Sequence, residues 1–320
     1  MPVSSFSMIY CDPDSGACYV YPPDDMTIDL AAAKALDAAP PALTPADVPL
    51  REGPPTREEL LVHYPARFIW QQLKCFVNSG DLGLLKRDKK LQQRYDLWTV
   101  GVRAKYGSMV SYLKTYRLQW GKPDARSLLP SSLPGLTTPK EASDVGEPQA
   151  EPELPPNVPP YFTADTSPEL ISIIMNDWPY SVPPEVEHAL IWTRIPAIPT
   201  DLPETIRPRV EQDGLWGFTG TTSAPPSPSL LPSFLPALAD WGVTMDKLVR
   251  SPKGSEEEDE LVRQAGTQIE TFIKRKWVER EWETAWFVNP PRLQSVPGLA
   301  HIHVFARRKT PEEVAAWQDL

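Results

Sequence analysis

The sequence predicts an α+β fold in which helices pack on an antiparallel sheet. Compact apolar runs at 187–194, 284–288 and 300–307 have the length and composition of strands. A long helical pattern at 256–282 precedes the last two runs, so the order is strand, long insertion, helix, strand, strand. That order is typical of an antiparallel sheet covered by helices. A second helical pattern at 56–120 precedes all of these elements and predicts an N-terminal helical subdomain.

Proline divides the chain into ordered and irregular parts. It supplies 39 of the 320 residues, more than twice the average usage of about 5%. We interpret residues 1–55 as a mobile tail and 121–166 as a Pro-rich linker that is too polar and too broken to pack. The remaining α+β domain then covers 167–320. Within it, residues 195–245 form a second Pro-rich insertion, which we expect to be a long surface excursion.

The helical subdomain carries its own start and stop signals. Thr56 and Glu59 have the spacing of a capping box at the start of a first helix. Asp88 is placed to cap a second, longer helix, and Gly107 ends it. Ser108 then begins a third helix. Apolar residues recur at helical spacing in each of them, so we expect three or four packed helices.

The later elements follow in order from similar signals. Ser167, followed by Pro and Glu, predicts a helix that runs to about Met175. The first strand ends before Pro196. Acidic residues crowd the beginning of the 256–282 helix and basic residues its end, which suits the helix dipole. A short C-terminal helix is expected from Pro311.

Charge and cysteine content limit the class of protein. The net charge is −10 and the isoelectric point about 5.0, so a nucleic-acid partner is not expected. The basic runs at 86–90 and 274–276 are interpreted as solvated helix faces. An odd, low number of cysteines (Cys11, Cys18 and Cys75) fits a reducing compartment. No apolar run is long enough to span a membrane and no secretory leader is apparent. We expect a soluble, cytoplasmic or nuclear protein.

Three of the four histidines fall on the best predicted strands, His188 on one and His301 and His303 on another. His301 and His303 are two residues apart, so their imidazoles share one face of a strand. His188 lies on the earlier strand and could reach them in one accessible pocket. Imidazole is a common phosphoryl nucleophile and general acid or base near neutral pH. The alternatives are three hydrogen-bonded core histidines or a metal site, although no fourth ligand stands at a suitable spacing.

Polar residues beside these strands are candidate ligand contacts. Asn289, Gln294 and Ser295 surround a Pro-Gly turn whose amides and hydroxyl could hold an anion, or the loop is an ordinary turn. Asp177 could orient the upstream histidine, or cap its own turn. Trp178 is either a core residue or part of a stacking wall for a base or sugar ring. No cofactor and no metal is predicted.

Two segments resemble the histidine triad (HIT) nucleotide-binding family, namely "NDWPYSVPPEVEHALIW" and "FVNPPRLQSVPGLAHIHVF". The resemblance implies a HIT-like sheet and a role for each matching residue. His301 would be the nucleophile, His303 the supporting histidine and His188 the upstream active-site histidine. Gln294 and Ser295 would hold phosphate and Asn289 would lie near the ribose. The sequence departs from the pattern at Leu299, where the family has its first histidine, and its Ser-to-His spacing is one residue longer.

A second resemblance covers more of the chain, about 60–310. The two segments above, together with "FIWQQLKCFVNSGDLGLLKRDKKLQQRYDLWTVGVRAKYGSMVSYL", resemble a fungal family named for an N-acetylglucosamine-induced protein. Its members carry a domain of unknown function. The family name implies expression in response to an amino sugar and implies no particular reaction.

Two functions follow from these observations. The first is a non-catalytic binding or regulatory role in sugar response or metabolism, with the Pro-rich segments 121–166 and 223–236 as docking sites for a protein partner. The second is a HIT-like phosphoryl or nucleotidyl hydrolase or transferase that uses a histidine nucleophile on a nucleotide or sugar-phosphate ligand. The sequence leaves the choice between them open.

Overall fold

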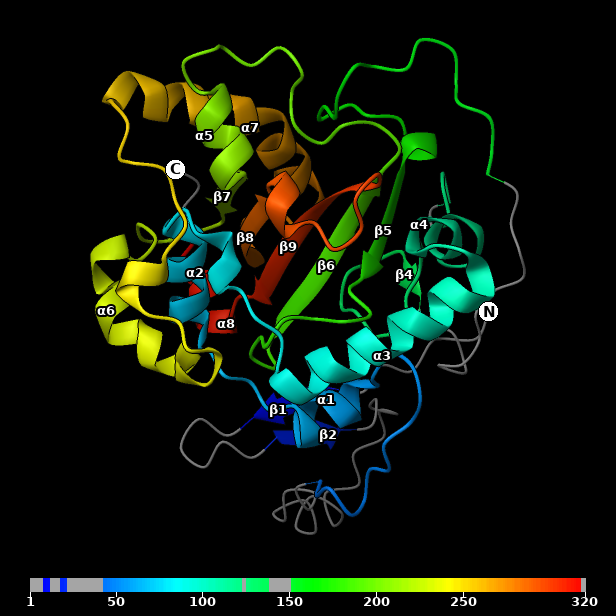
Figure 1. The fold of residues 1–320 in the computed structure, drawn as a ribbon. Coiled ribbons are helices and arrows are strands. Elements are labelled where there is room, and N and C mark those ends of the chain that lie inside the picture. Colours follow the sequence, from blue (N-terminus) through cyan, green and yellow to red (C-terminus); the bar gives the residue numbers. More distant parts are fainter. Residues whose placement is uncertain (1–7, 12–17, 22–42, 123–124, 138–150, 318–320) are drawn as a thin grey trace.

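A five-stranded antiparallel sheet forms the centre of the molecule (Figure 1). The computed structural model describes residues 8–11, 18–21, 43–122, 125–137 and 151–317 of the chain. The strand order is β5-β6-β9-β8-β7. The strands are β5 (Ile171–Met175), β6 (Val186–Thr193), β7 (Leu215–Thr219), β8 (Trp282–Val288) and β9 (Ala300–Arg308). The expected antiparallel sheet with packed helices is therefore confirmed.

Two small sheets lie outside the central one. β1 (Met8–Cys11) and β2 (Cys18–Tyr21) pair as an antiparallel hairpin. β3 (Ala125–Arg126) and β4 (Leu136–Thr137) pair in parallel. The mobile tail expected over 1–55 lies mostly outside the described residues.

Helices from the N-terminal block cover one face of the sheet. They are α1 (Arg57–His63), α2 (Trp70–Asn78), α3 (Lys89–Tyr106) and α4 (Met109–Tyr112), which continues into a π-helical turn. In Figure 1, α3 passes in front of the sheet near the lower end of β6. The predicted capping box of Thr56 and Glu59 is present, and Asp88 and Ser108 cap α3 and α4 as expected. None of the helices in the described ranges is both long and apolar enough to cross a bilayer.

The opposite face of the sheet packs against α7 (Glu256–Lys276). The contact depends on two glycines, because Trp286 of β8 fills the space beside both. A Cβ atom at Gly266 of α7 would lie 2.8 Å from the Trp286 ring, and one at Gly217 of β7 would lie 2.7 Å from it. Trp286 is 1% exposed. The absence of side chains at these glycines therefore lets the helix approach the sheet closely.

Two regular elements lie where the sequence suggested otherwise. The helix expected from Ser167 to Met175 is wrong: only Pro168–Leu170 forms a 3-10 turn, and the β-branched run that follows is strand β5. The expected surface excursion over 195–245 contains α5 (Arg207–Asp213) and edge strand β7. The helix expected over 256–282 ends at Lys276. The predicted C-terminal helix is present as α8 (Pro311–Ala315).

The Pro-rich segments also pack more than expected. The buried residues of segment 121–166 include Leu128, Leu129, Leu133, Leu136 and Phe162, so the expectation that this segment cannot pack is wrong for them. Segment 223–236 includes a 3-10 turn and helix α6 (Leu231–Phe234), and its Leu231 is fully buried beside α2. That part of the segment is helical, so it does not offer a preformed extended ligand.

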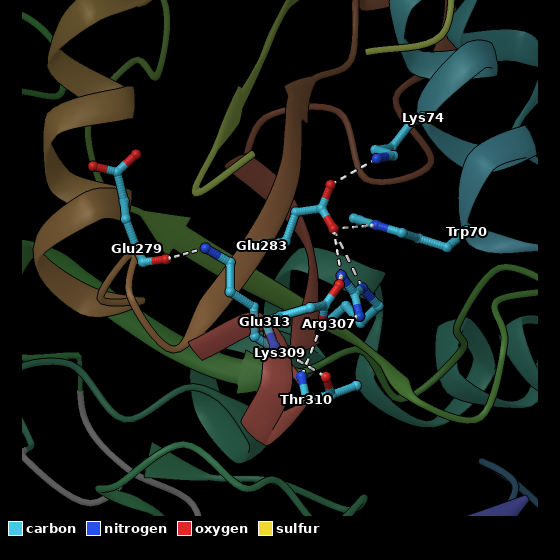
Figure 2. Close-up of polar contacts among 8 residues, drawn as sticks. All are labelled: Trp70, Lys74, Glu279, Glu283, Arg307, Lys309, Thr310 and Glu313. Atoms are coloured by element: carbon cyan, nitrogen blue, oxygen red, sulfur yellow. Dashed lines mark hydrogen bonds and ion pairs between the residues drawn. The ribbon is translucent and has the colours of Figure 1, made fainter. Parts of the chain in front are cut away.

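A buried ionic network ties α2 and the C-terminal segment to the sheet (Figure 2). Glu283 of β8 accepts hydrogen bonds from Lys74 Nζ at 2.6 Å and from Trp70 Nε1 at 2.8 Å. Arg307 of β9 donates from Nη2 to Glu283 at 2.8 Å and to Glu313 of α8 at 2.8 Å. The carboxylate of Glu283 thus joins three elements of the chain.

Candidate functional site

Strand register brings the three predicted histidines together. In the β6–β9 pairing, His301 lies opposite Trp192 and His303 opposite Leu190. His188 lies opposite Phe305, on the same face of the sheet. The Nε2 atom of His188 is 3.0 Å from Nδ1 of His303. The ring centroids of His301 and His303 are 5.0 Å apart. The expected convergence of imidazoles from separate segments is present.

The tautomers of His188 and His303 follow from their partners. The backbone N–H of Tyr180 donates to Nδ1 of His188 at 3.2 Å, so a neutral His188 carries its proton on Nε2 and donates it to His303 Nδ1. His303 then carries its own proton on Nε2, which is 3.2 Å from the amide of Asn289. Turning that amide by half a revolution pairs this proton with Asn289 Oδ1, which otherwise has no partner among the described residues.

Both of these imidazoles are held neutral. Burial lowers the pKa of His188 well below its ordinary value, with smaller effects of the charges on Arg87 and His301. Burial, together with His301, His188 and Arg87, lowers the pKa of His303 in the same way. The pair therefore forms a neutral hydrogen-bonded chain from Tyr180 to Asn289.

His301 has a different arrangement. Its Nδ1 is 3.1 Å from the carbonyl oxygen of Leu299, which can only accept, so the proton lies on Nδ1. Nε2 then carries a lone pair, and no hydrogen bond engages it within the described part of the chain. Burial lowers the pKa of His301, and the Leu299 hydrogen bond opposes part of that effect. The ring lies 4.4 Å from the Trp192 ring.

A small aromatic cavity separates His301 and His303 from the helical layer. It encloses about 50 Å³ between the sheet and helices α3 and α4. A water molecule needs roughly 10–15 Å³ by this measure, so the cavity has room for a few waters. Its aromatic wall consists of Tyr95, Trp98, Tyr112, Trp178 and Trp192.

Two indole groups in that wall lack hydrogen-bond partners. The Nε1 atoms of Trp178 and Trp192 are buried and unpaired among the described residues. A buried donor without a partner costs about 1–3 kcal/mol. Two residues of the wall therefore carry unsatisfied donors and His301 carries a free lone pair, beside polar side chains such as Asn176, Asp177 and Ser295 that also line the cavity.

The carboxylate predicted to orient the upstream histidine has another partner. Asp177 accepts two hydrogen bonds from Arg117, at 2.9 and 2.7 Å, and this buried ion pair lies beside the cavity. No hydrogen bond or ion pair joins Asp177 to His188 among the described residues, so the carboxylate does not orient that ring as expected. The neighbouring Asn176 lies against His188 instead, with its Nδ2 atom 3.4 Å from both ring nitrogens.

The predicted anion-binding loop is only partly at the cavity. Ser295 lines it, whereas Gln294 uses its amide to donate to the carbonyl oxygen of Asn289 at 3.3 Å. Asn289 reaches His303 but is not part of the cavity wall. Trp178 lines the cavity and is 4% exposed. The loop therefore contributes the Ser295 hydroxyl to the cavity lining, while the Gln294 amide supports the loop backbone.

Several neighbours of the site were not predicted. Arg87 was interpreted as part of a solvated basic face, but it is half-buried, donates to the Trp178 carbonyl at 2.8 Å and lies 4.5 Å from the Tyr95 ring. Asn176 and Tyr180 were likewise missed. Nothing in the local pattern distinguishes them, because their contacts cross between segments that are distant in sequence.

The expectation of an accessible histidine pocket is wrong for this conformation. His188, His301 and His303 are 1%, 6% and 4% exposed. Residues of α3 and α4 line the cavity on the side away from the sheet. In the ranges that the structure describes, no group of three or more His, Cys, Asp or Glu side chains is arranged to hold a metal ion. The metal interpretation of the three histidines is therefore not supported.

Comparison with known proteins gives a family and little else. A family model described as "Protein of unknown function (DUF3605)" matches residues 69–212 and 248–307, which is more than half of the chain. No curated protein matches the sequence. A solved structure described as "Crystal Structure of HTC1" aligns with a TM-score of 0.38 and 18% identity, over 78% of this chain and 92% of that one. This distant likeness lends no support to the resemblance to the HIT family.

Proposed function

Since the chain belongs to the DUF3605 family of proteins of unknown function, we propose that it is a non-catalytic binding protein for a small hydroxylated ligand. The resemblance to the N-acetylglucosamine-induced family points to an amino sugar or its phosphate as that ligand. Both halves of the site fall within the residues that the family model matches. The role that follows is regulatory, in the response to the sugar or in its metabolism.

The observation that carries this proposal is the unsatisfied polarity of the aromatic cavity. The indole N–H groups of Trp178 and Trp192 lack acceptors among the described residues, and the Nε2 lone pair of His301 can accept a hydrogen bond. A sugar hydroxyl can act as both donor and acceptor. The apolar C–H faces of a sugar ring can also pack against the flat indole and phenol rings.

The size of the cavity explains how binding could produce a signal. About 50 Å³ accommodates a few waters but not a hexose ring. Binding therefore requires α3 and α4 to move away from the sheet. A ligand that binds only the open arrangement shifts the population toward it. A partner protein that contacts the helical layer would then respond to whether the ligand is bound.

Calorimetric titration tests the proposal with N-acetylglucosamine, glucosamine 6-phosphate and glucose as the probes. We expect Trp192→Phe, which keeps a ring and removes the N–H donor, and His301→Ala to weaken binding of the amino sugars roughly tenfold or more. Trp241→Phe, in the separate cluster beside α2, is the matched control and should bind as the wild type does. Equal affinities in all four proteins, or no binding of either amino sugar, would refute the proposal.

A second function is favoured by the anchoring of His301. A neutral imidazole with Nδ1–H held by the Leu299 carbonyl presents an Nε2 lone pair, as a nucleophile requires. Nε2 would form a bond to phosphorus while the bond to the leaving oxygen breaks, and water would then cleave the P–N bond. The hydroxyl of Ser295 lines the same cavity and could donate to a phosphoryl oxygen.

Intact-protein mass spectrometry separates the two functions. After incubation with a sugar phosphate or a nucleotide, catalysis predicts a covalent phosphoryl or nucleotidyl adduct on His301 that is absent in His301→Ala. Binding with neither an adduct nor product formation supports the regulatory role alone.

A further inference from the structure

A second hollow opens on a different part of the molecule and shares no residue with the histidine cavity. It has a volume of about 690 Å³, and its lining comes from the end of α2, helix α5, strand β7 and the segment that precedes α7. Small-molecule sites usually measure about 300–1,000 Å³. This cleft is therefore large enough for a metabolite without any rearrangement of the helices.

Its walls carry more positive than negative charge, although the chain as a whole is acidic. Arg209, Arg250 and Lys253 line the cleft, and Asp213 is the one acidic side chain that does so. Asp213 is buried and accepts from the backbone N–H of Ser251 at 2.9 and 3.1 Å. The Asp213 carboxylate is thus already engaged in hydrogen bonds to the backbone of the lining.

Two of the three cations are available to a ligand. Arg209 forms an ion pair with Asp259. Among the described residues Arg250 makes one hydrogen bond, from Nη1 to the Ser79 carbonyl at 3.2 Å, and its other guanidinium N–H groups have no partner there. Lys253 is exposed and forms no ion pair within the part of the chain that the structure describes. A guanidinium and an ammonium group together match a phosphoryl or carboxylate anion.

An aromatic ring stands beside these cations. Trp216 of β7 is half-buried, and a Cβ atom at Gly80 would lie 3.4 Å from its ring and 3.8 Å from the Cβ of Arg250. The indole and the arginine stem therefore lie beside the same backbone position, where the φ of +82° favours glycine. Met245 and Leu248 add apolar surface to the lining.

We infer that this cleft is a second ligand site, which binds a small organic phosphate with a flat ring. Arg250 and Lys253 hold the phosphoryl oxygens, and the ring of the ligand packs on Trp216. The site does not depend on the sugar ligand proposed above, because its lining is separate and its shape is already open. A ligand here would contact α5 and the segment before α7.

Calorimetry at low ionic strength tests the inference with phenyl phosphate and inorganic phosphate as probes. We expect Arg250→Ala/Lys253→Ala to weaken phenyl phosphate binding roughly tenfold or more. Trp216→Leu should weaken phenyl phosphate binding and leave the weaker binding of inorganic phosphate unchanged. The matched control is Arg103→Ala/Lys105→Ala on α3, which removes the same charge from exposed positions outside the cleft.

Three results would overturn the inference. They are no binding of phenyl phosphate to the wild type, equal weakening in the cleft and control variants, and equal affinity of Trp216→Leu for phenyl phosphate. Thermal unfolding of each variant establishes that it is folded before its affinity is compared. If Trp216→Leu fails to fold, the two arginine–lysine double variants still decide the question.

Discussion

Replacing Glu283 by glutamine should destabilise the protein more than replacing a glutamate of an exposed ion pair by glutamine. The carboxylate accepts from Lys74, Trp70 and Arg307 (Figure 2). The side chains of Lys74 and Glu283 are only 3% and 8% exposed. Glu283→Gln preserves the shape but leaves the ammonium of Lys74 buried without its counter-charge. Breaking a buried pair in this way costs about 3–5 kcal/mol.

Urea unfolding followed by circular dichroism measures this loss. The matched control is Glu260→Gln, whose ion pair with Arg263 is 52% and 67% exposed and should contribute at most about 1 kcal/mol. The double variant Lys74→Met/Glu283→Gln removes both charges and should regain at least half of the stability lost in Glu283→Gln. If Glu283→Gln costs no more than Glu260→Gln, the argument from burial is wrong.

The Glu283 carboxylate should also make the free energy of unfolding depend on pH in the acid range. Burial raises the pKa of Glu283, but hydrogen bonds from Lys74, Arg307 and Trp70 outweigh it and hold the pKa below its ordinary value of 4.5. A carboxyl group whose pKa is lower in the folded than in the unfolded protein stabilises the fold at pH values above its unfolded-state pKa. That stabilisation is lost as the pH falls through its folded-state pKa. The decline in unfolding free energy below pH 4.5 should therefore be shallower in Glu283→Gln than in the wild type.

Three other predictions concern packing and the histidines. Gly266→Ala places a Cβ atom 2.8 Å from the Trp286 ring and should lower the unfolding free energy by about 1–3 kcal/mol. Gly101→Ala on α3 has no neighbour within 4 Å and should raise it by up to about 1 kcal/mol; in urea titrations, a gain for Gly266→Ala or a loss for Gly101→Ala would contradict the corresponding prediction. Because burial lowers the pKa of His188 and His303, the unfolded chain takes up protons that the folded one does not, so stability should be constant well above pH 6.5 and fall as the pH drops through that value. Urea midpoints on either side of that pH check this, and an unchanged midpoint would contradict it. Nitrogen-15 NMR should find both rings neutral and protonated at Nε2, and an Nδ1 proton on either ring would refute the hydrogen-bond chain.

Local signals in the sequence predicted the elements that depend on nearby residues. The capping box of Thr56 and Glu59 needs only a spacing of three, and it is present. The alternation along 300–307 placed His301 and His303 on one face, as β9 does. The same kind of signal failed at Ser167, where a good helix start was followed by a β-branched run that pairs with β6. A partner strand outweighed the local preference there.

Other features had no local signal at all. The edge strand β7 contains Gly217, which weakens any strand pattern, and its place is set by Trp286 on the neighbouring strand. Leucines of a Pro-rich stretch such as Leu129 and Leu133 are buried because the fold provides a surface for them. Local sequence patterns describe one segment at a time. Burial of that segment depends on the surface that distant parts of the chain form around it.

The sequence by itself therefore determined the helical block, the three longest strands, the shared face of His301 and His303, and membership of a family without an assigned reaction. Only the tertiary structure decided that His188 meets His303 across 115 residues of chain, that Asp177 pairs with Arg117, and that α3 and α4 line the cavity. Periodicity and capping act over a turn or two of chain, so a sequence can reveal them. The meeting of distant side chains depends on strand register and on the packing of whole layers, which form only when the complete chain folds.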